Sequence, residues 1–100
     1  MNDLIRQAQM LQKKMLQMQE ELKNKVVEAS AGGGMVQVKV SGGQEVLEIK
    51  IDPTVVDPND VQMLEDLVLA AVNDGLKKAK EMVQSEMSQL TGGLNIPGLF

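Results

Sequence analysis

The chain has 100 residues, enough for one small domain, and it contains no cysteine, no histidine and a single aromatic residue. These absences exclude disulfides, Cys/His metal sites, thiol nucleophiles and an imidazole base, so we expect no catalytic site, no metal and no cofactor. The net charge of −4 argues against a polyanionic partner, but residues 1–25 carry +2 and residues 75–100 carry +1, whereas residues 44–74 carry −7. The charge pattern therefore predicts an acidic middle between two modestly basic ends.

Residues 3–24 predict one long helix. Apolar residues recur at alternating spacings of four and three, which is the pattern of a heptad seam, and no glycine or proline interrupts them. Asn2 or Asp3 can cap the N-terminus. Such a helix is about 33 Å long, whereas a globule of this size has a radius of gyration of about 13 Å, so part of its apolar surface is expected to need a second chain. The seam contains Leu4, Ala8, Leu11, Met15, Met18 and Leu22, with Ile5, Met10 and Leu16 beside it.

The middle of the chain predicts an antiparallel meander of three strands with one wet face. The strands are expected over residues 25–30, 35–41 and 44–51, with a break at the three glycines of residues 32–34. Gly42-Gly43 predicts a two-residue hairpin turn, because both positions can take a positive φ. The alternation places Val36, Val38 and Val40 on one side of the second strand, and Leu47, Ile49 and Ile51 inward on the third.

A helical period follows the turn-rich segment 52–59. Asn59 or Asp60 is expected to cap this C-terminal helical region, and Gly75 predicts a kink or break that gives helices near 60–74 and 76–90. Gly92-Gly93 is expected to stop the helix and to leave residues 92–100 as a flexible tail. The predicted fold class is α+β, with a long N-terminal helix, a three-stranded antiparallel meander and a C-terminal helical region in one domain, residues 1–91.

The sequence contains no membrane signal. The first four residues have no apolar stretch typical of a signal peptide, and the longest strictly apolar run, residues 67–72, is far shorter than a membrane span. We therefore expect a cytoplasmic protein with no membrane partner.

Several motifs occur in a fixed order along the chain. They are QAQM at residues 7–10, AGGGMVQVKVSGGQEV at 31–46, IKIDP at 49–53, MLEDL at 63–67, AAVND at 70–74 and the PGLF ending. Together they resemble the YbaB/EbfC family of bacterial nucleoid-associated proteins. The resemblance implies a tweezer-like homodimer whose helices project from a joined sheet core and bind double-stranded DNA in the nucleoid. It implies a protein that is not an enzyme and has no small-molecule substrate.

Two groups of basic residues are the candidate DNA contacts. Lysine and arginine neutralise phosphates, and glutamine can hydrogen-bond phosphate or base edges. On the first helix, Arg6 and Lys13 share a face, and the second group is a cluster of three lysines. The competing interpretation is that both are solvated helix faces, with the lysines paired to Asp74 or Glu81. The candidate residues are Arg6, Gln9, Lys13, Lys14, Gln17, Lys23, Lys25, Lys77, Lys78 and Lys80.

Three further motifs have simpler explanations than a ligand site. The triple glycine lacks the lysine and hydroxyl residue of a phosphate-binding loop, which favours a strand connection. The acidic residues between Asp52 and Asp60 do not match the spacing of a calcium loop, which favours turns and caps. The methionines favour core filling, but they also support a second hypothesis for function, a protein-interaction module that grips a partner through exposed Met/Leu helix surfaces.

Overall fold

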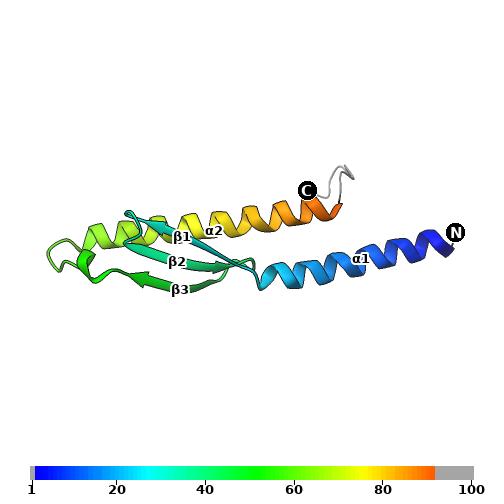
Figure 1. Ribbon diagram of the computed structural model, residues 1–100, viewed down its shortest axis with the longest axis horizontal. Helices are drawn as coiled ribbons and strands as arrows, with labels where there is room; N and C mark the ends of the chain where they lie inside the picture. Colours follow the sequence, from blue (N-terminus) through cyan, green and yellow to red (C-terminus); the bar gives the residue numbers. More distant parts are fainter. Residues whose placement is uncertain (1, 92–100) are drawn as a thin grey trace.

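The molecule is elongated (Figure 1). This computed structural model describes residues 2–91, so the tail predicted over residues 92–100 lies outside the described residues. The extents are 70 × 22 × 16 Å and the radius of gyration is 19.0 Å, well above the ~13 Å of a compact chain of this length. The predicted fold class and order of elements are confirmed. The elements are α1 (Asn2–Lys23), β1 (Val26–Ala31), β2 (Val36–Ser41), β3 (Val46–Ile51), a 3₁₀ turn η1 (Pro53–Val55) and α2 (Val61–Thr91).

The three strands form one antiparallel sheet in the order β1-β2-β3. Val38 in the centre of β2 pairs with Ala29 of β1 and with Ile49 of β3. The outer face of the sheet is polar. There Lys39 lies 3.4 Å from a carboxylate oxygen of Glu48 and 3.9 Å from one of Glu28, so one β2 lysine bridges both neighbouring strands. The predicted wet face is therefore confirmed.

Helix α2 covers the other face of the sheet, mainly over β1 and β2. The alternating valines of β2, Val36, Val38 and Val40, are fully buried beneath it. The prediction that the apolar residues of β3 point inward is confirmed for the side that Ile49 and Ile51 take, but these residues are not buried. Ile49 and Ile51 share the face of the β2 valines because they pair with Val38 and Val36, but α2 contacts β3 much less than β1 and β2, and β3 lies farthest from it in Figure 1. Leu47, Ile49 and Ile51 are consequently 51%, 44% and 39% exposed.

The predicted break at Gly75 is wrong, because α2 is one continuous helix. Gly75 is buried at the point where the helix approaches the sheet most closely. A Cβ atom at this position would lie 2.7 Å from Cγ2 of Val40 and 3.0 Å from Cγ2 of Val38. Glycine is thus present for close packing rather than to end the helix, and Ala71 and Ala79, one turn away on either side, are also fully buried.

Replacing Gly75 with alanine is expected to destabilise the protein by about 1–2 kcal/mol, as overpacking does. Helix propensity alone predicts the opposite, a gain of about 1 kcal/mol. Urea unfolding of Gly75→Ala measures the sign directly. In a double-mutant cycle with Val40→Ala, which removes the methyl group in the way, the two changes should cost less together than their sum. A more stable Gly75→Ala variant would contradict this packing.

Short polar caps end the sheet and begin α2. The backbone N–H and the hydroxyl of Thr54 both donate to Oδ1 of Asp52, at 2.9 and 2.8 Å, and these hydrogen bonds lower the pKa of the Asp52 carboxyl. The backbone N–H of Met63 donates to Oδ1 of Asp60 at 3.2 Å. Of the two predicted caps for this helix, Asp60 therefore serves the role.

Candidate nucleic-acid interface

Helix α1 projects beyond the sheet beside the C-terminal half of α2, so that the two helices form a pair of neighbouring rods (Figure 1). The seam predicted for α1 is only partly used. Leu22 is buried and Met15 and Met18 are half-buried, and Met87 of α2, the helix that α1 contacts, is also buried. At the other end of the seam, Leu4 is 71% exposed. The arm is therefore packed at its base and open to solvent over its N-terminal half.

The turn between β2 and β3 fixes the base of the arm. The carbonyl oxygen of Leu22 occupies the position that a Cβ atom on Gly42 would take, and the N–H of Gly42 donates to the carbonyl of Lys25 at 2.8 Å. The predicted hairpin turn has Gly42 and Gly43 at its centre, where the N–H of Gln44 donates to the carbonyl of Ser41 at 2.9 Å, but neither glycine takes a positive φ. The left-handed residue of this turn is Gln44, at φ 64°, and its side-chain amide donates to the carbonyl of Leu76 at 3.3 Å. The lack of a side chain at these glycines lets the end of α1 approach the turn closely, and neither glycine adopts a left-handed backbone.

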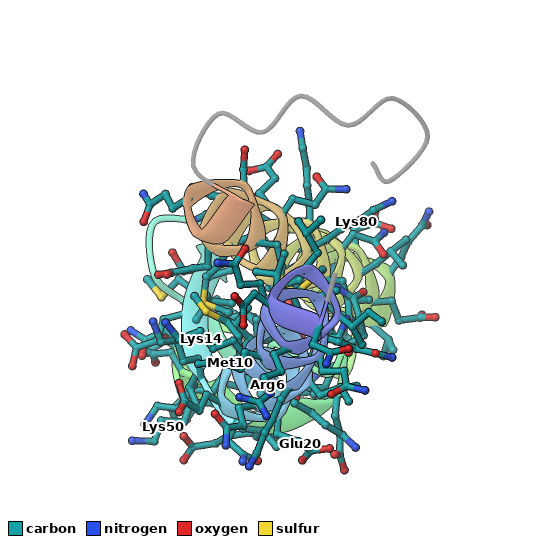
Figure 2. The ribbon with its side chains drawn as sticks, turned by 90° about the vertical axis from the view of Figure 1, so that its right-hand side faces the viewer. Arg6, Met10, Lys14, Glu20, Lys50 and Lys80 are labelled. Carbon is teal, nitrogen blue, oxygen red and sulfur yellow. The ribbon has the colours of Figure 1, made fainter. Side chains whose placement is uncertain are left out.

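Arg6 and Lys13 lie on the face of α1 turned away from α2, and Lys14 borders this face. With 100° between successive residues, Arg6 and Lys13 lie roughly opposite the seam, and Figure 2 shows Arg6 pointing away from α2 and Lys14 toward one side. Arg6, Lys13 and Lys14 are exposed and have no ion-pair partner among the described residues. Glu20 points to the same side as Arg6 and reduces the positive charge of this face toward the base.

The other α1 candidates flank this strip. Gln9 and Gln17 lie on either side of the line through Arg6 and Lys13 and are exposed, and Lys23 is exposed in the last turn. Arg6, Gln9, Lys13 and Gln17 therefore share one face of α1, and Lys14 and Lys23 lie at its two sides.

The lysines of α2 do not join this strip within one chain. Lys80 points to the opposite side of the molecule from Arg6 (Figure 2). Nζ of Lys78 lies 3.3 Å from a carboxylate oxygen of Asp74 one turn earlier, which is the helix ion pair that competed with a phosphate contact. Lys77 and Lys80 are exposed and have no ion-pair partner in the described part of the chain. The ten candidate residues thus divide into six on α1, three lysines on α2, and Lys25 between α1 and β1.

Lys25 is also engaged within the chain. Its Nζ lies 3.1 Å from Oε1 of Glu86, and this pair joins the residue just before β1 to the last part of α2. The two residues are 61 positions apart, so no local signal in the sequence could show the contact.

Replacing Glu86 with glutamine should tighten duplex binding several-fold at low salt, because it frees Lys25 and removes one negative charge from the arm. The free energy of unfolding should fall by only about 0–1 kcal/mol, since the side chains of Lys25 and Glu86 are both partly exposed. Glu81→Gln is the matched control, because it makes the same change of charge on the same helix without breaking the Lys25 pair. Equal gains from both variants, by fluorescence anisotropy, would assign no role to Lys25.

Two further bases, Lys39 and Lys50, lie outside the candidates that the sequence suggested. They border a shallow hollow of about 350 Å³ on the outer face of the sheet, which Lys78 reaches from α2. Two of these three lysines are engaged by acids, because Lys39 lies between Glu28 and Glu48 and Lys78 pairs with Asp74. We therefore do not assign a phosphate site to it.

Charge is separated along the length of the molecule. The acidic segment, residues 44–74, includes β3, η1 and the start of α2, and it lies at the end of the molecule opposite the N-terminus of α1 (Figure 1). The exposed bases of α1 occupy the other end. Among residues 2–91, no group of acidic side chains is arranged to hold a metal ion, and neither helix is long and apolar enough to cross a membrane.

Residues 1–94 match the model of the YbaB/EbfC DNA-binding family. The chain belongs to this family. A "Nucleoid-associated protein" of Syntrophobacter fumaroxidans is 62% identical over 95 residues, which are 95% of this chain and 86% of the relative. A nucleoid-associated protein of Thermoanaerobacter pseudethanolicus is 59% identical over 99 residues, which are 99% of this chain and 89% of the relative.

A solved structure shows the same fold. It is a crystal structure of an uncharacterised Helicobacter pylori protein with a TM-score of 0.75 and 25% identity, covering 92% of this chain and 97% of that one. The family resemblance inferred from the motifs is therefore confirmed. The family is described by DNA binding rather than by an enzymatic activity.

Proposed function

We propose that this YbaB/EbfC family member binds double-stranded DNA as a homodimer in the bacterial nucleoid. The observation that carries the proposal is the α1 strip of Arg6, Lys13 and Lys14, which is exposed, free of ion pairs within the described chain and mounted on a projecting rod. A dimer presents this strip twice, so that two arms can engage one duplex with greater avidity than one. The names of the relatives, nucleoid-associated proteins, support the same assignment.

The contacts available on the arms are of the kind that position a protein on DNA. Lysine and arginine neutralise backbone phosphates, which carries no sequence information, and the neighbouring Gln9 and Gln17 can add hydrogen bonds to phosphates or base edges. Sequence preference is accordingly weak or set by the shape of the duplex. Binding of this kind suits nucleoid organisation and gene regulation.

A fluorescence-anisotropy titration of a short duplex tests the proposal. If Arg6, Lys13 and Lys14 of both copies neutralise about six phosphates, affinity should fall on the order of 10³-fold between about 50 and 200 mM salt. Two duplexes of unrelated sequence but similar groove width should bind within a few-fold of each other. Absence of binding at the lower salt concentration would defeat the proposal.

The interaction-module hypothesis is supported by a different observation. Met10 and Leu16, outside the seam, are 66% and 58% exposed on the same arm, and Ile5 is 57% exposed. Exposed apolar residues on a helix can hold a partner helix. A pull-down from nuclease-treated lysate separates the two functions, because partners retained without nucleic acid would favour protein recognition, whereas their loss would favour DNA.

A further inference from the structure

The apolar seam of α1 is covered at one end and open at the other. Near the sheet, Leu22 is buried and Met15 and Met18 are half-buried, and α1 contacts α2. Toward the N-terminus the same seam continues with Leu11 and Leu4, which are 39% and 71% exposed. All residues of the seam lie within about 40° of one line along the helix, so they form a single stripe that is only partly buried.

The seam is open where α2 has already ended. The ion pair between Lys25 and Glu86 places this part of α2 beside the base of α1. Thr91, the last residue of α2, lies only about 8 Å farther along the helix. The two helices run in opposite directions, and the N-terminal half of α1 projects past the end of α2 (Figure 1). The uncovered residues of the seam, here called the open seam, are Leu4, Ala8 and Leu11.

The residues that follow Thr91 are numerous enough to cover the open seam. Residues 92–100 can span up to about 30 Å when extended, whereas the helix from Met18, which is still half-buried, to Leu4 is only about 21 Å long. Where α2 ends, it points toward the N-terminus of α1, and the strands lie toward the other end of the molecule (Figure 1). Residues 92–100 are therefore the part of this sequence that is within reach of the open seam.

The composition of residues 92–100 favours burial. The segment contains no charged residue and four large apolar residues, one of which is the only aromatic residue of the chain. Segments that remain disordered in water are typically rich in charge and poor in large apolar residues. The glycines at 92 and 93 led us to expect a flexible tail, but the residues after them match an apolar surface better than water. These apolar residues are Leu94, Ile96, Leu99 and Phe100.

We propose that residues 94–100 dock along the open seam of α1 in their own chain, beyond the point where α2 ends. Ala8, the smallest residue of the seam, leaves room between Leu4 and Leu11 for a bulky side chain. Removing both apolar surfaces from water stabilises the docked state and protects the N-terminal half of α1 from fraying. Arg6 and Lys13 lie roughly opposite the seam and stay exposed, so the docking does not depend on the proposed DNA binding.

A tryptophan in the segment reports the docking. Because the chain contains no tryptophan or tyrosine, Phe100→Trp introduces a single strong fluorophore in place of another large aromatic side chain. Acrylamide should quench this fluorophore several-fold more slowly in the protein than in a free peptide of residues 91–100 with the same change, because docking removes the ring from solvent. Equal quenching in the protein and in the peptide would overturn the proposal.

Two pairs of substitutions on α1 identify the surface. In the Phe100→Trp protein, Leu4→Gln with Leu11→Gln removes the large apolar side chains of the open seam, so the quenching rate should rise toward that of the free peptide. Ile5→Gln with Leu16→Gln is the matched control, because these residues are 57% and 58% exposed on the same helix but lie outside the seam. The control should keep the slow quenching. An equal rise from both pairs would reject the open seam as the docking surface.

Cross-linking distinguishes docking within one chain from docking on a second copy. Because the chain has no cysteine, Gln7→Cys beside the open seam and Asn95→Cys in the segment introduce two thiols. A short bismaleimide should join them within one chain, which gives a monomer on denaturing gels with linked tryptic peptides. Gln9→Cys, on the other side of α1, replaces Gln7→Cys in the control and should not be linked to residue 95. Cross-linked dimers as the main product would assign the open seam to a second copy and overturn the proposal.

Discussion

Changing Arg6, Lys13 and Lys14 together to glutamate should abolish duplex binding while leaving the fold and the dimer intact. Arg6 and Lys13 are exposed on the face of α1 turned away from α2, and Lys14 is exposed beside that face, so their replacement creates no cavity and breaks no ion pair of the described chain. In a dimer the change removes about six phosphate contacts and adds repulsion. We expect a loss of at least about 100-fold in affinity near 50 mM salt.

The control must separate local charge from net charge. Neutralising the three bases to glutamine lowers the net charge by three, and so does the triple change Asn59→Asp, Gln62→Glu and Asn73→Asp at the acidic end of the molecule, where all three residues are exposed. The arm variant should lose most of its binding and flatten the salt dependence by about five units of slope. The acidic-end variant should bind almost as the wild type does. Equal losses would mean that only net charge matters.

Gly42→Ala should be the most damaging single substitution at the base of the arm. The new Cβ would overlap the carbonyl oxygen of Leu22, and a backbone atom in the last turn of α1 cannot rotate away as a side chain can. Either the turn or the helix must move, which also strains the hydrogen bond from Gly42 to Lys25. We expect a loss of about 3 kcal/mol in the free energy of unfolding, together with faster hydrogen exchange in the last turns of α1.

Gly43→Ala is the matched control. Its Cβ would lie 2.9 Å from Cγ of Lys23, an exposed side chain that can change rotamer. Neither glycine takes a left-handed backbone, and both substitutions restrict the unfolded chain equally, so the difference between them reports the clash alone. Gly43→Ala should cost about 0.5 kcal/mol or less. Similar stabilities for the two variants in urea would show that α1 does not rest on Gly42.

The first prediction tests the basic residues of α1, and the second tests the close contact between Gly42 and Leu22 that orients α1 relative to the sheet. The bases of α1 contribute positive charge whether or not the helix is held against the β2–β3 turn. The α1 helices of a dimer can bind one duplex together, however, only if their directions are fixed relative to the sheet. Gly42→Ala should therefore weaken binding to a long duplex more than the loss in the free energy of unfolding alone explains. Loss of the charges should weaken binding to duplexes of every length.

The elements of this protein, and the grouping of the α1 bases on one face, were determined by the sequence because periodicity is a local property. A spacing of four and three residues fixes a seam, and it also fixes that Arg6 and Lys13 lie away from it. Alternation in β2 likewise decided that Val36, Val38 and Val40 are buried on one side. The order of motifs was enough to indicate the family.

The tertiary structure decided what covers each element, because coverage depends on residues distant in the chain. The sequence predicts a helix break at Gly75, whereas the structure shows that a Cβ atom at this position would lie only 2.7 Å from Cγ2 of Val40 in the sheet. The alternation of β3 gave its apolar face correctly, but only the position of α2 over β1 and β2 shows that this face is left open. The pairing of Lys25 with Glu86, and the opposite directions of Arg6 and Lys80, likewise follow from how α1 and α2 are set against the sheet, which no local spacing encodes.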